Sequence, residues 1–479
     1  MNVSSTSIDV SRSSSKFVIP INSHSIINFH DPLSGELQDR GHQVTFIPQN
    51  EQISETAKNR LSTENLRLKY LNHEPTTNFD LLCKKYEIDS PKQIVFPQMV
   101  YDRSYDAPSY RPYWFSGSTP LDYDRYLDLL HRTLDYLDTL YKNGEGGIPL
   151  QYQGAEVLRR ALQRVADYHG YQSVRTSFSP MPGKMLFRST ESMYLPALEE
   201  ATYEEMTSEE REAARDFRET VVGDKEQVIG SSTNTESLYE NIRRKGQRIR
   251  EYKYDILPVA VDWLRRRGAK RVLGSVAKRM YMNEEQSRKV IESNRYIFYP
   301  IQYFRESRAT IRAPEFYNQL WLIEYLSRSL PHGYELVVKD HPQQLGALPL
   351  SHVRKMKRYA TAIAPTIPAR EVVTHADAIV TLNNTVGYEA IMYGKPVIVL
   401  GDAFYSGVGY TQDVTEISLL SKELKKVVTS QGLSTDEVLE FAHGILHSSY
   451  DGSWGKTHPE NIETFVESVI EYHTNDGRK

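Results

Sequence analysis

Cysteine is nearly absent from this sequence, since Cys83 is the only one among 479 residues. A single thiol excludes a disulfide within the chain and any cysteine-rich metal site, and it fits a reducing compartment. We therefore expect Cys83 to be a small apolar residue in a buried core.

Long apolar runs are missing as well. No stretch of about 18 apolar residues occurs, so the sequence predicts no transmembrane helix. Residues 1–16, MNVSSTSIDVSRSSSK, are rich in serine and lack the apolar core of a secretory signal. We predict a disordered tail over residues 1–16 and a cytoplasmic location for the protein.

The chain also lacks a strong excess of charge of one sign. Charged residues make up 25% of the sequence and the net charge is −4, so no nucleic-acid partner is indicated. The charge is unevenly distributed, however. Glutamates crowd residues 199–226, where Thr207 and Glu210 predict a capping box at the start of a helix, whereas residues 243–279 contain thirteen Lys and Arg.

We predict from this contrast a charged helical insertion or linker over residues 196–292. A solvated surface is the favoured interpretation of its basic half. The alternative is attraction of this half to an anionic glycolipid or to the inner membrane surface, which would make the protein a peripheral membrane protein.

The length of the chain predicts two domains, because single cores stop growing near roughly 250 to 300 residues. Apolar runs that are typical of strands alternate with amphipathic helical patterns on both sides of the insertion. The predicted strands are residues 17–21, 42–48, 93–99, 173–178, 296–300, 334–339, 378–382 and 397–400. We therefore predict an α/β protein with two Rossmann-like domains, at residues 17–195 and 293–479.

The stretch from Glu371 to Leu400 organises the second domain. It contains two predicted strands with room for one short helix between them. Asn384 and Thr385 stand where that helix should begin, so they offer side-chain oxygens and backbone N–H groups at the positive end of its dipole. This arrangement predicts a phosphate site, with Glu389 one turn further along to meet hydroxyl groups of the ligand.

A second cluster of polar side chains follows the strand YELVVK, which ends in Lys339-Asp340-His341-Pro342. Ligands bind at the carboxyl ends of parallel strands, so we expect Lys339 and His341 to face the same crevice as Asn384 and Thr385. Together these groups would form an anion clamp.

A third cluster lies after the strand YIFYP. We expect its polar side chains to contact a base, a ribose or a sugar, and we expect the segment around Tyr405 to close over the crevice. The candidates are Gln302, Arg305, Glu306, Ser307, Arg308, Glu389 and Tyr405.

The segments YIFYPIQYFRESRATI, ELVVKDHP and ADAIVTLNNTVGYEAIMYGKPVIVLGDAFY, in this order, resemble the capsule polysaccharide biosynthesis family, which includes Kdo transferases with a GT-B fold. The resemblance covers about residues 295–410. It implies glycosyl transfer from a nucleotide sugar to a surface polysaccharide or glycolipid. It also implies that His341, Asn384 and Thr385 contact the donor phosphate. This chain has Asn384-Thr385 where the family has Ser-Thr or Ser-Ser, so CMP-Kdo is not assumed as donor.

The chemistry expected at such a site is stabilisation of a leaving phosphate by fixed donors and positive charge. No Asp-x-Asp at a strand end indicates a metal, and Asp122 and Asp124 instead predict the start of a helix. We therefore predict no metal and no cofactor. His341 is the principal catalytic candidate. A base from the first domain is sought among His30, Asp31 and Glu36, with Asp31 as the candidate.

Three other interpretations stay open at this point. The chain could be a polyol-phosphate transferase of the teichoic type or a nucleotide-sugar 2-epimerase, both of which use related frames. It could also be a non-catalytic protein of the same fold that binds a nucleotide sugar or scaffolds an export complex.

Overall fold

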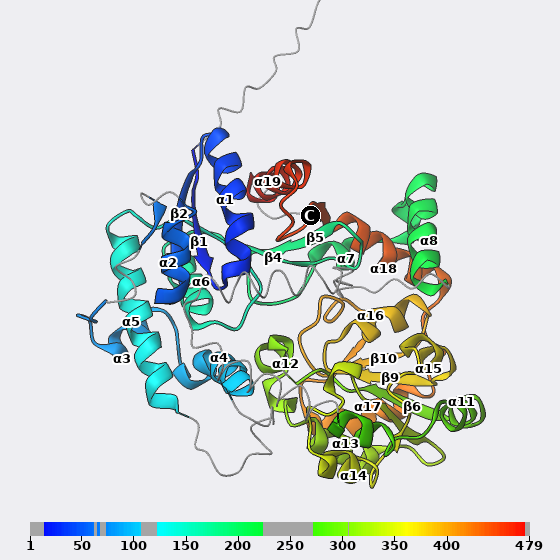
Figure 1. Ribbon diagram of the computed structural model, residues 1–479. Coiled ribbons are helices and arrows are strands. Elements are labelled where there is room, and N and C mark those ends of the chain that lie inside the picture. Colours follow the sequence, from blue (N-terminus) through cyan, green and yellow to red (C-terminus); the bar gives the residue numbers. More distant parts are fainter. Residues whose placement is uncertain are drawn as a thin grey trace, which may run out of the picture.

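The computed structural model describes residues 14–61, 65–67, 73–106, 122–223, 272–304 and 306–474. Within them the chain forms two six-stranded sheets flanked by helices, which confirms the predicted α/β class. Figure 1 shows the half of the molecule that carries the first sheet above the half that carries the second. Most of the predicted tail and residues 224–271 of the predicted insertion lie outside the described residues.

The first sheet has the strand order β12-β5-β4-β3-β1-β2. Its strands are β1 (Lys16–Ile21), β2 (Gln43–Pro48), β3 (Ile148–Tyr152), β4 (Val174–Phe178), β5 (Lys184–Arg188) and β12 (Ser449–Asp451). The four strands β1 to β4 are parallel, and β5 and β12 add an antiparallel edge. After Lys16, β1 is apolar and buried, with Phe17 and Ile19 in the core on one face of the sheet and Val18 in the core on the other.

The helices of this half are α1 (His24–Asp39), α2 (Glu51–Lys58), α3 (Phe79–Lys85), α4 (Pro91–Asp106), α5 (Tyr123–Lys142) and α6 (Val157–Tyr168). Cys83 in α3 is buried, as predicted. The predicted helix start at Asp122 and Asp124 is present. The side chain of Asp122 caps the first turn of α5 by accepting a hydrogen bond from the Arg125 N–H at 3.3 Å.

The prediction of an extended segment over residues 93–99 is wrong, because these residues lie in α4. Ile94, Val95 and Met99 are buried together on one side of that helix. Pro97 has no N–H for the carbonyl four residues earlier, at Gln93. The guanidinium of Arg160 donates a hydrogen bond to that carbonyl at 2.7 Å, which compensates for the missing donor.

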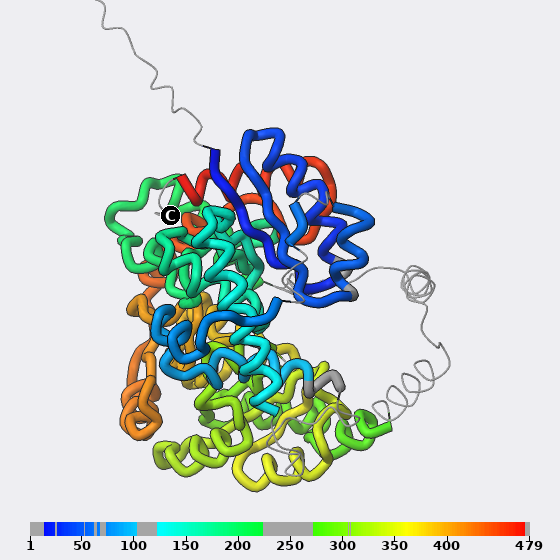
Figure 2. Tube along the Cα trace, turned by 90° about the vertical axis from the view of Figure 1, so that its left-hand side faces the viewer, coloured from blue at the N-terminus to red at the C-terminus, as the bar shows by residue number. Residues whose placement is uncertain are grey.

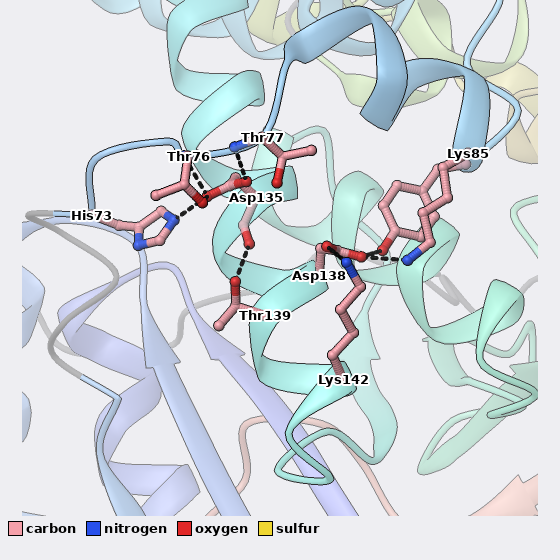
Figure 3. A network of polar contacts seen from close by, with 9 residues as sticks. His73, Thr76, Thr77, Lys85, Asp135, Asp138, Thr139 and Lys142 are labelled. Atoms are coloured by element: carbon pink, nitrogen blue, oxygen red, sulfur yellow. Dashed lines mark hydrogen bonds and ion pairs between the residues drawn. The ribbon is translucent and has the colours of Figure 1, made fainter.

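Buried acidic residues on α5 hold the segment that precedes and includes α3 (Figure 3). The Asp135 carboxylate accepts hydrogen bonds from the backbone N–H groups of Thr76 and Thr77 at 3.0 and 2.9 Å, and lies 2.7 Å from the His73 ring. One turn later, the Asp138 carboxylate forms ion pairs with Lys85 and with Lys142 of the next turn. Burial alone would raise the pKa of Asp135, but these hydrogen bonds outweigh burial and lower it to about 2.

The second sheet is entirely parallel and has the order β11-β10-β9-β6-β7-β8. Its strands are β6 (Tyr296–Pro300), β7 (Glu335–Lys339), β8 (Thr361–Ala362), β9 (Ala378–Thr381), β10 (Val397–Val399) and β11 (Gln412–Asp413). The helices of this half are α11 (Glu284–Ser293), α12 (Ser307–Arg312), α13 (Gln319–Ser329), α14 (Leu350–Met356), α15 (Ala369–His375), α16 (Thr385–Met392), α17 (Leu420–Val427) and α18 (Thr435–His447). The two Rossmann-type sheets with a cleft between them make the fold GT-B-like.

The described part of the predicted insertion packs against the second half of the molecule. It contains α7 (Pro196–Glu200) and α8 (Ser208–Val222), and α8 contacts α16 and α18. The predicted capping box is present, since the Thr207 hydroxyl accepts from the Glu210 N–H and the Glu210 carboxylate accepts from the Thr207 N–H. In the part of the chain that the structure describes, no helix is long and apolar enough to cross a membrane.

The end of the chain departs from the predicted second domain of residues 293–479. β12 pairs with β5 of the first sheet, and α19 (Pro459–Thr474) packs against α1. Both views show α19, in red, beside the blue α1 (Figures 1 and 2). The reason is burial: Phe465 and Val469 complete the core under the first sheet, whereas a helical pattern alone does not specify which sheet it will cover.

Candidate functional site

A cavity of about 630 Å³ lies between the two halves of the molecule. In the second sheet it opens beside β6 and β9, which are neighbours although the chain runs from β6 to β7 on one side and from β9 to β10 on the other. Such a reversal of strand order leaves a crevice outside the carboxyl ends of the strands, where open parallel sheets bind ligands. The first half of the molecule contributes the opposite wall through Gln153, Ser177, Phe178 and Met193.

The cavity brings together most of the predicted side chains. They come from the segment after β6 (Gln302, Glu306 and Arg308), from the end of β7 and the turn after it (Lys339 and His341), and from the N-cap and body of α16 (Asn384, Thr385 and Glu389). The expected convergence of the three strand ends is therefore present in the structure.

The ring of His341 is held in one orientation from two sides. It stacks on Tyr303 with ring centroids 5.4 Å apart, and its Nδ1 accepts a hydrogen bond from the Gln343 N–H at 3.2 Å. Burial lowers the pKa of His341 and so favours the neutral ring, while the Glu306 carboxylate opposes this shift. Since Nδ1 is an acceptor, the proton of the neutral ring lies on Nε2, which can donate to a ligand.

Lys339 and Glu389 are partly buried in the same cavity and interact electrostatically. Burial lowers the pKa of the Lys339 ammonium, whereas the charges of Asp340 and Glu389 oppose that shift. Burial also raises the pKa of Glu389, to about 7, although Lys339 opposes the change. Glu389 therefore changes its protonation state near neutral pH.

Asn384 is the N-cap of α16, as its position in the sequence predicted, but its side chain is engaged within the protein. The side-chain oxygen of Asn384 caps the helix by accepting from the Val386 N–H at 3.1 Å, and its amide nitrogen donates to the Pro300 carbonyl at 3.1 Å. Both ends of the Asn384 amide are thus used within the protein. Thr385, the first residue of the helix, lines the cavity and has no hydrogen-bond partner for its hydroxyl among the described residues.

Two buried amides on the cavity wall have an oxygen without a hydrogen-bond partner among the described residues. Asn383 donates through Nδ2 to the carbonyl of Arg308 at 3.1 Å, and its Oδ1 is unpaired. Gln302 donates to Glu306, and its Oε1 is unpaired. A buried oxygen without a donor is unfavourable, so these two atoms mark positions where a ligand donor would be stabilised.

A direct hydrogen bond joins the two walls of the cavity. Nη2 of Arg312, in α12, donates to Oε1 of Gln153 at 2.5 Å. Arg312 is largely withdrawn from solvent, and burial together with the charges of Arg188 and Arg308 lowers its pKa. The Asp402 carboxylate opposes this shift.

Several predicted residues are placed elsewhere. Tyr405 is fully buried behind α16, where its hydroxyl donates to the Asn384 carbonyl at 2.6 Å, so it supports the helix start and does not line the cavity. Arg305 lies outside the described residues, and of Ser307 only the position at the start of α12 is described.

The candidates for a base are not in the cavity either. Asp31 is an exposed residue of α1 that lines a different, shallow depression with Arg60. Glu36 forms an ion pair with Arg40 of the same helix. His30 is fully buried among aromatic rings, and burial lowers its pKa to about 3. α1 starts at the carboxyl end of β1 and runs away from it. His30, Asp31 and Glu36 lie in the later turns of this helix and therefore do not reach the cavity.

The residues that sequence reasoning missed come mostly from the first half of the molecule. Gln153 and Ser177 lie at the ends of β3 and β4, and β3 was not predicted because IPLQY is short and contains a proline. Tyr303 belongs to the polar cluster after β6, but nothing in the sequence indicated that its ring would stack on His341 and hold it in place. Among the described residues, no group of three His, Cys, Asp or Glu side chains is arranged to hold a metal ion.

Residues 218–439 match the model of a family described as capsule polysaccharide biosynthesis protein. This segment of the chain is therefore similar to that family. The segment contains the whole second sheet and every residue that this sheet contributes to the cavity.

Curated relatives share part of the chain. The capsule polysaccharide modification protein LipA of Neisseria meningitidis serogroup A is 32% identical over 170 residues, which are 34% of this chain and 22% of LipA. The capsule polysaccharide export protein KpsS of Escherichia coli is 33% identical over 129 residues, which are 24% of this chain and 32% of KpsS. The chain thus spans less than a third of the length of these relatives.

Among solved structures, a KpsC of Thermosulfurimonas dismutans, described as a β-Kdo 2,7 transferase, is 14% identical and covers 70% of this chain and 88% of its own, with a TM-score of 0.37. A UDP-GlcNAc 2-epimerase from Neisseria meningitidis, solved with UDP-GlcNAc, is 12% identical and covers 96% and 100%, with a TM-score of 0.25.

Proposed function

We propose that the protein transfers a sugar from a nucleotide-sugar donor to a capsular-type polysaccharide or glycolipid acceptor in the cytoplasm. The observation that carries the proposal is the meeting of the His341 ring, the Lys339 ammonium and the start of α16 in one cavity between the two halves. The match of residues 218–439 to a family of capsule polysaccharide biosynthesis proteins supports the same chemistry.

The side chains that line the cavity can stabilise a phosphate as it leaves the donor sugar. When the bond from the anomeric carbon to the phosphate oxygen breaks, negative charge develops on that oxygen. Nε2–H of His341 and the Lys339 ammonium are donors to this charge, and the Thr385 hydroxyl and the dipole of α16 add to them. Because the His341 ring is fixed by Tyr303 and the Gln343 N–H, it needs no reorientation as the charge develops.

The donor's nucleoside and sugar would contact the remaining polar groups of the cavity. The unpaired oxygens of Asn383 and Gln302 are suited to hydroxyl or amino donors of a base, ribose or sugar. Glu389 can accept hydrogen bonds from a diol when it is ionised, as predicted from its position in α16.

The test is incubation of the purified protein with CMP-, UDP- and GDP-linked sugars, with and without a glycan acceptor, while nucleotide release is measured. Release that depends on the acceptor supports the proposal and names the donor. Interconversion of free nucleotide sugars without release would identify a 2-epimerase, and transfer of a polyol phosphate would identify a teichoic-type transferase. Binding without any turnover would identify a scaffold.

We also propose that the protein associates peripherally with an anionic membrane. Val272, Leu273 and Val276 are 65%, 41% and 39% exposed on one short helical stretch, and the cations Lys278 and Arg279 follow directly. Apolar side chains beside positive charge are typical of surfaces that bind acidic lipid headgroups.

A further inference from the structure

The turn that carries His341 is built around a buried carboxylate. Asp340 is 2% exposed and lies directly between the end of β7 and His341. Its Oδ1 accepts hydrogen bonds from the His341 N–H at 2.9 Å and from Nε2 of Gln344, and its Oδ2 accepts from the hydroxyl of Tyr281. Both oxygens of the carboxylate are therefore engaged by donors of the protein itself, and one of these donors is the backbone of His341.

Gln344 ties this turn to the loop that carries Tyr303. Its side chain is buried, and while Nε2 donates to Asp340, Oε1 accepts from the Phe304 N–H at 3.0 Å. Its own N–H donates to the His341 carbonyl at 2.8 Å. Tyr303, which precedes Phe304, stacks on the His341 ring. One glutamine thus holds together the two segments whose rings face each other.

Tyr281 brings a third segment of the chain to the same carboxylate. Its ring is buried in the core that contains Leu336 and Val338 of β7. Burial and the charge of Asp340 raise the pKa of the Tyr281 hydroxyl, which therefore stays protonated and remains a donor. Because the ring is fixed in the core, the hydroxyl gives the carboxylate, and the turn that depends on it, a rigid support.

The sheet by itself does not fix His341. The pairing of β6 with β7 ends at Pro300 and Lys339, and His341 lies two residues beyond. A displacement of about 1 Å at a catalytic group can lower the rate about a hundredfold, so a donor at such a position needs support from its surroundings. A buried carboxylate is costly to place, and the three donors around Asp340 both compensate for this cost and supply the support.

We propose that Asp340, Gln344 and Tyr281 form a positioning unit for His341, which aims its ring at the departing phosphate. The inference rests on the proposed function for the reaction that His341 serves. A polar network that only stabilised the fold would affect unfolding alone. A positioning unit affects the rate as well, and only as long as His341 is present.

The first experiment measures kinetics in two backgrounds. Gln344→Met keeps the length of the side chain and removes its hydrogen bonds, and Tyr281→Phe removes one hydroxyl. We expect each change to lower kcat about tenfold while the donor KM changes by less than about twofold, because His341 interacts most strongly with charge that develops in the transition state. In the His341→Ala background the same changes should lower the residual kcat by less than about twofold, since the group they position is absent.

Tyr296→Phe is the matched control. Tyr296 is also buried in the second half, and its hydroxyl donates to the Val372 carbonyl at 2.6 Å, at the opposite end of β6 from the cavity. This variant should keep kcat within about twofold of the wild type and lower the urea midpoint about as much as Tyr281→Phe, since each loses one buried hydrogen bond. If Gln344→Met does not fold, Tyr281→Phe decides the outcome alone. An unchanged kcat, or an equal fall with and without His341, would overturn the proposal.

The second experiment needs no transfer activity, so it separates this proposal from the proposed function. NMR of protein labelled at the histidine ring carbons measures the Cε1–H signal of His341, which is assigned by its absence in His341→Ala. In the wild type and in Tyr296→Phe we expect this signal to be displaced by the ring current of Tyr303, and in Gln344→Met to lose that displacement. If no nucleotide sugar is turned over but this pattern is found, the proposed function fails and the positioning unit stands. The same signal in the wild type and in Gln344→Met would refute the positioning unit.

Discussion

The side-chain amide of Asn384 donates a hydrogen bond to the Pro300 carbonyl at 3.1 Å, which ties the start of α16 to the end of β6. Its oxygen caps the helix at the same time. An asparagine can do both because its amide carries an acceptor and a donor on separate atoms. Asn384 therefore shapes the site, and Thr385 is the residue of the pair that remains available to a ligand.

Replacing Asn384 with Ala should mainly lower stability, because it removes a helix cap and leaves the Pro300 carbonyl without its donor. We expect a loss of about 1 to 3 kcal/mol in the free energy of unfolding, measured by urea titration. Thr385→Val should leave the unfolding midpoint nearly unchanged and weaken donor binding about tenfold. If Asn384→Ala instead weakened donor binding at unchanged stability, and Thr385→Val lowered stability, Asn384 would be the residue that contacts the ligand.

His341→Ala should lower kcat at least about a hundredfold, the typical loss for one fixed donor to developing charge. The thermal midpoint should barely change, since the ring is partly exposed to the cavity. His332→Ala, at an exposed histidine before β7, is the control and should retain full activity. Survival of activity in His341→Ala, or global unfolding of this variant, would make His341 a structural residue.

Glu389 gives the site a pH dependence near neutrality. Its pKa in the folded protein is about 7, above the value of about 4.5 in an unfolded chain. The folded state binds the proton of Glu389 more tightly, so the contribution of Glu389 to stability is largest below about pH 4.5 and is lost as the pH rises through about 7. We expect Glu389→Gln to be more stable than the wild type at pH 8 and equally stable at pH 4.

The same group should affect donor binding in the opposite direction. If ionised Glu389 accepts from a diol, donor affinity in the wild type rises as the pH passes through 7, and Glu389→Gln loses this dependence. Calorimetric titration with the donor at pH 6 and pH 8 measures the affinity of the wild type and of Glu389→Gln. Equal affinities at the two pH values in the wild type would exclude this role.

Asp135 should contribute to acid sensitivity far from the site. Its pKa is lowered to about 2, so the stabilisation it provides is complete above about 3.8 and is lost as the pH falls from about 3.8 to 2. Asp135→Asn should cost about 2 to 3 kcal/mol at pH 7 and show a flatter decline below pH 4. Asp128→Asn, exposed on the same helix, is the control. Parallel pH curves for the wild type and Asp135→Asn would contradict the expectation.

The apolar and basic stretch before α11 predicts binding to vesicles. We expect sedimentation with liposomes that contain acidic phospholipid, decreasing as salt is raised from 0.05 to 0.5 M (roughly a threefold fall in Debye length). Leu273→Ser should reduce binding several-fold without changing activity on a water-soluble acceptor. If the protein bound only neutral liposomes, or bound no liposomes, the proposed association with an anionic membrane would be refuted.

The chain's own sequence determined most of the second sheet and the gathering of His341, Lys339 and Thr385. Short β-branched runs that end in polar residues predict parallel strands, and parallel strands necessarily bring their carboxyl ends to one edge. Tertiary structure alone decided which side chains face across the gap. The contact of Gln153 with Arg312 joins residues far apart in the chain, and Trp454 reaches the first half only because α19 buries its apolar face there. Local spacing specifies an element and its apolar side, but the partner of that side depends on how the whole chain packs.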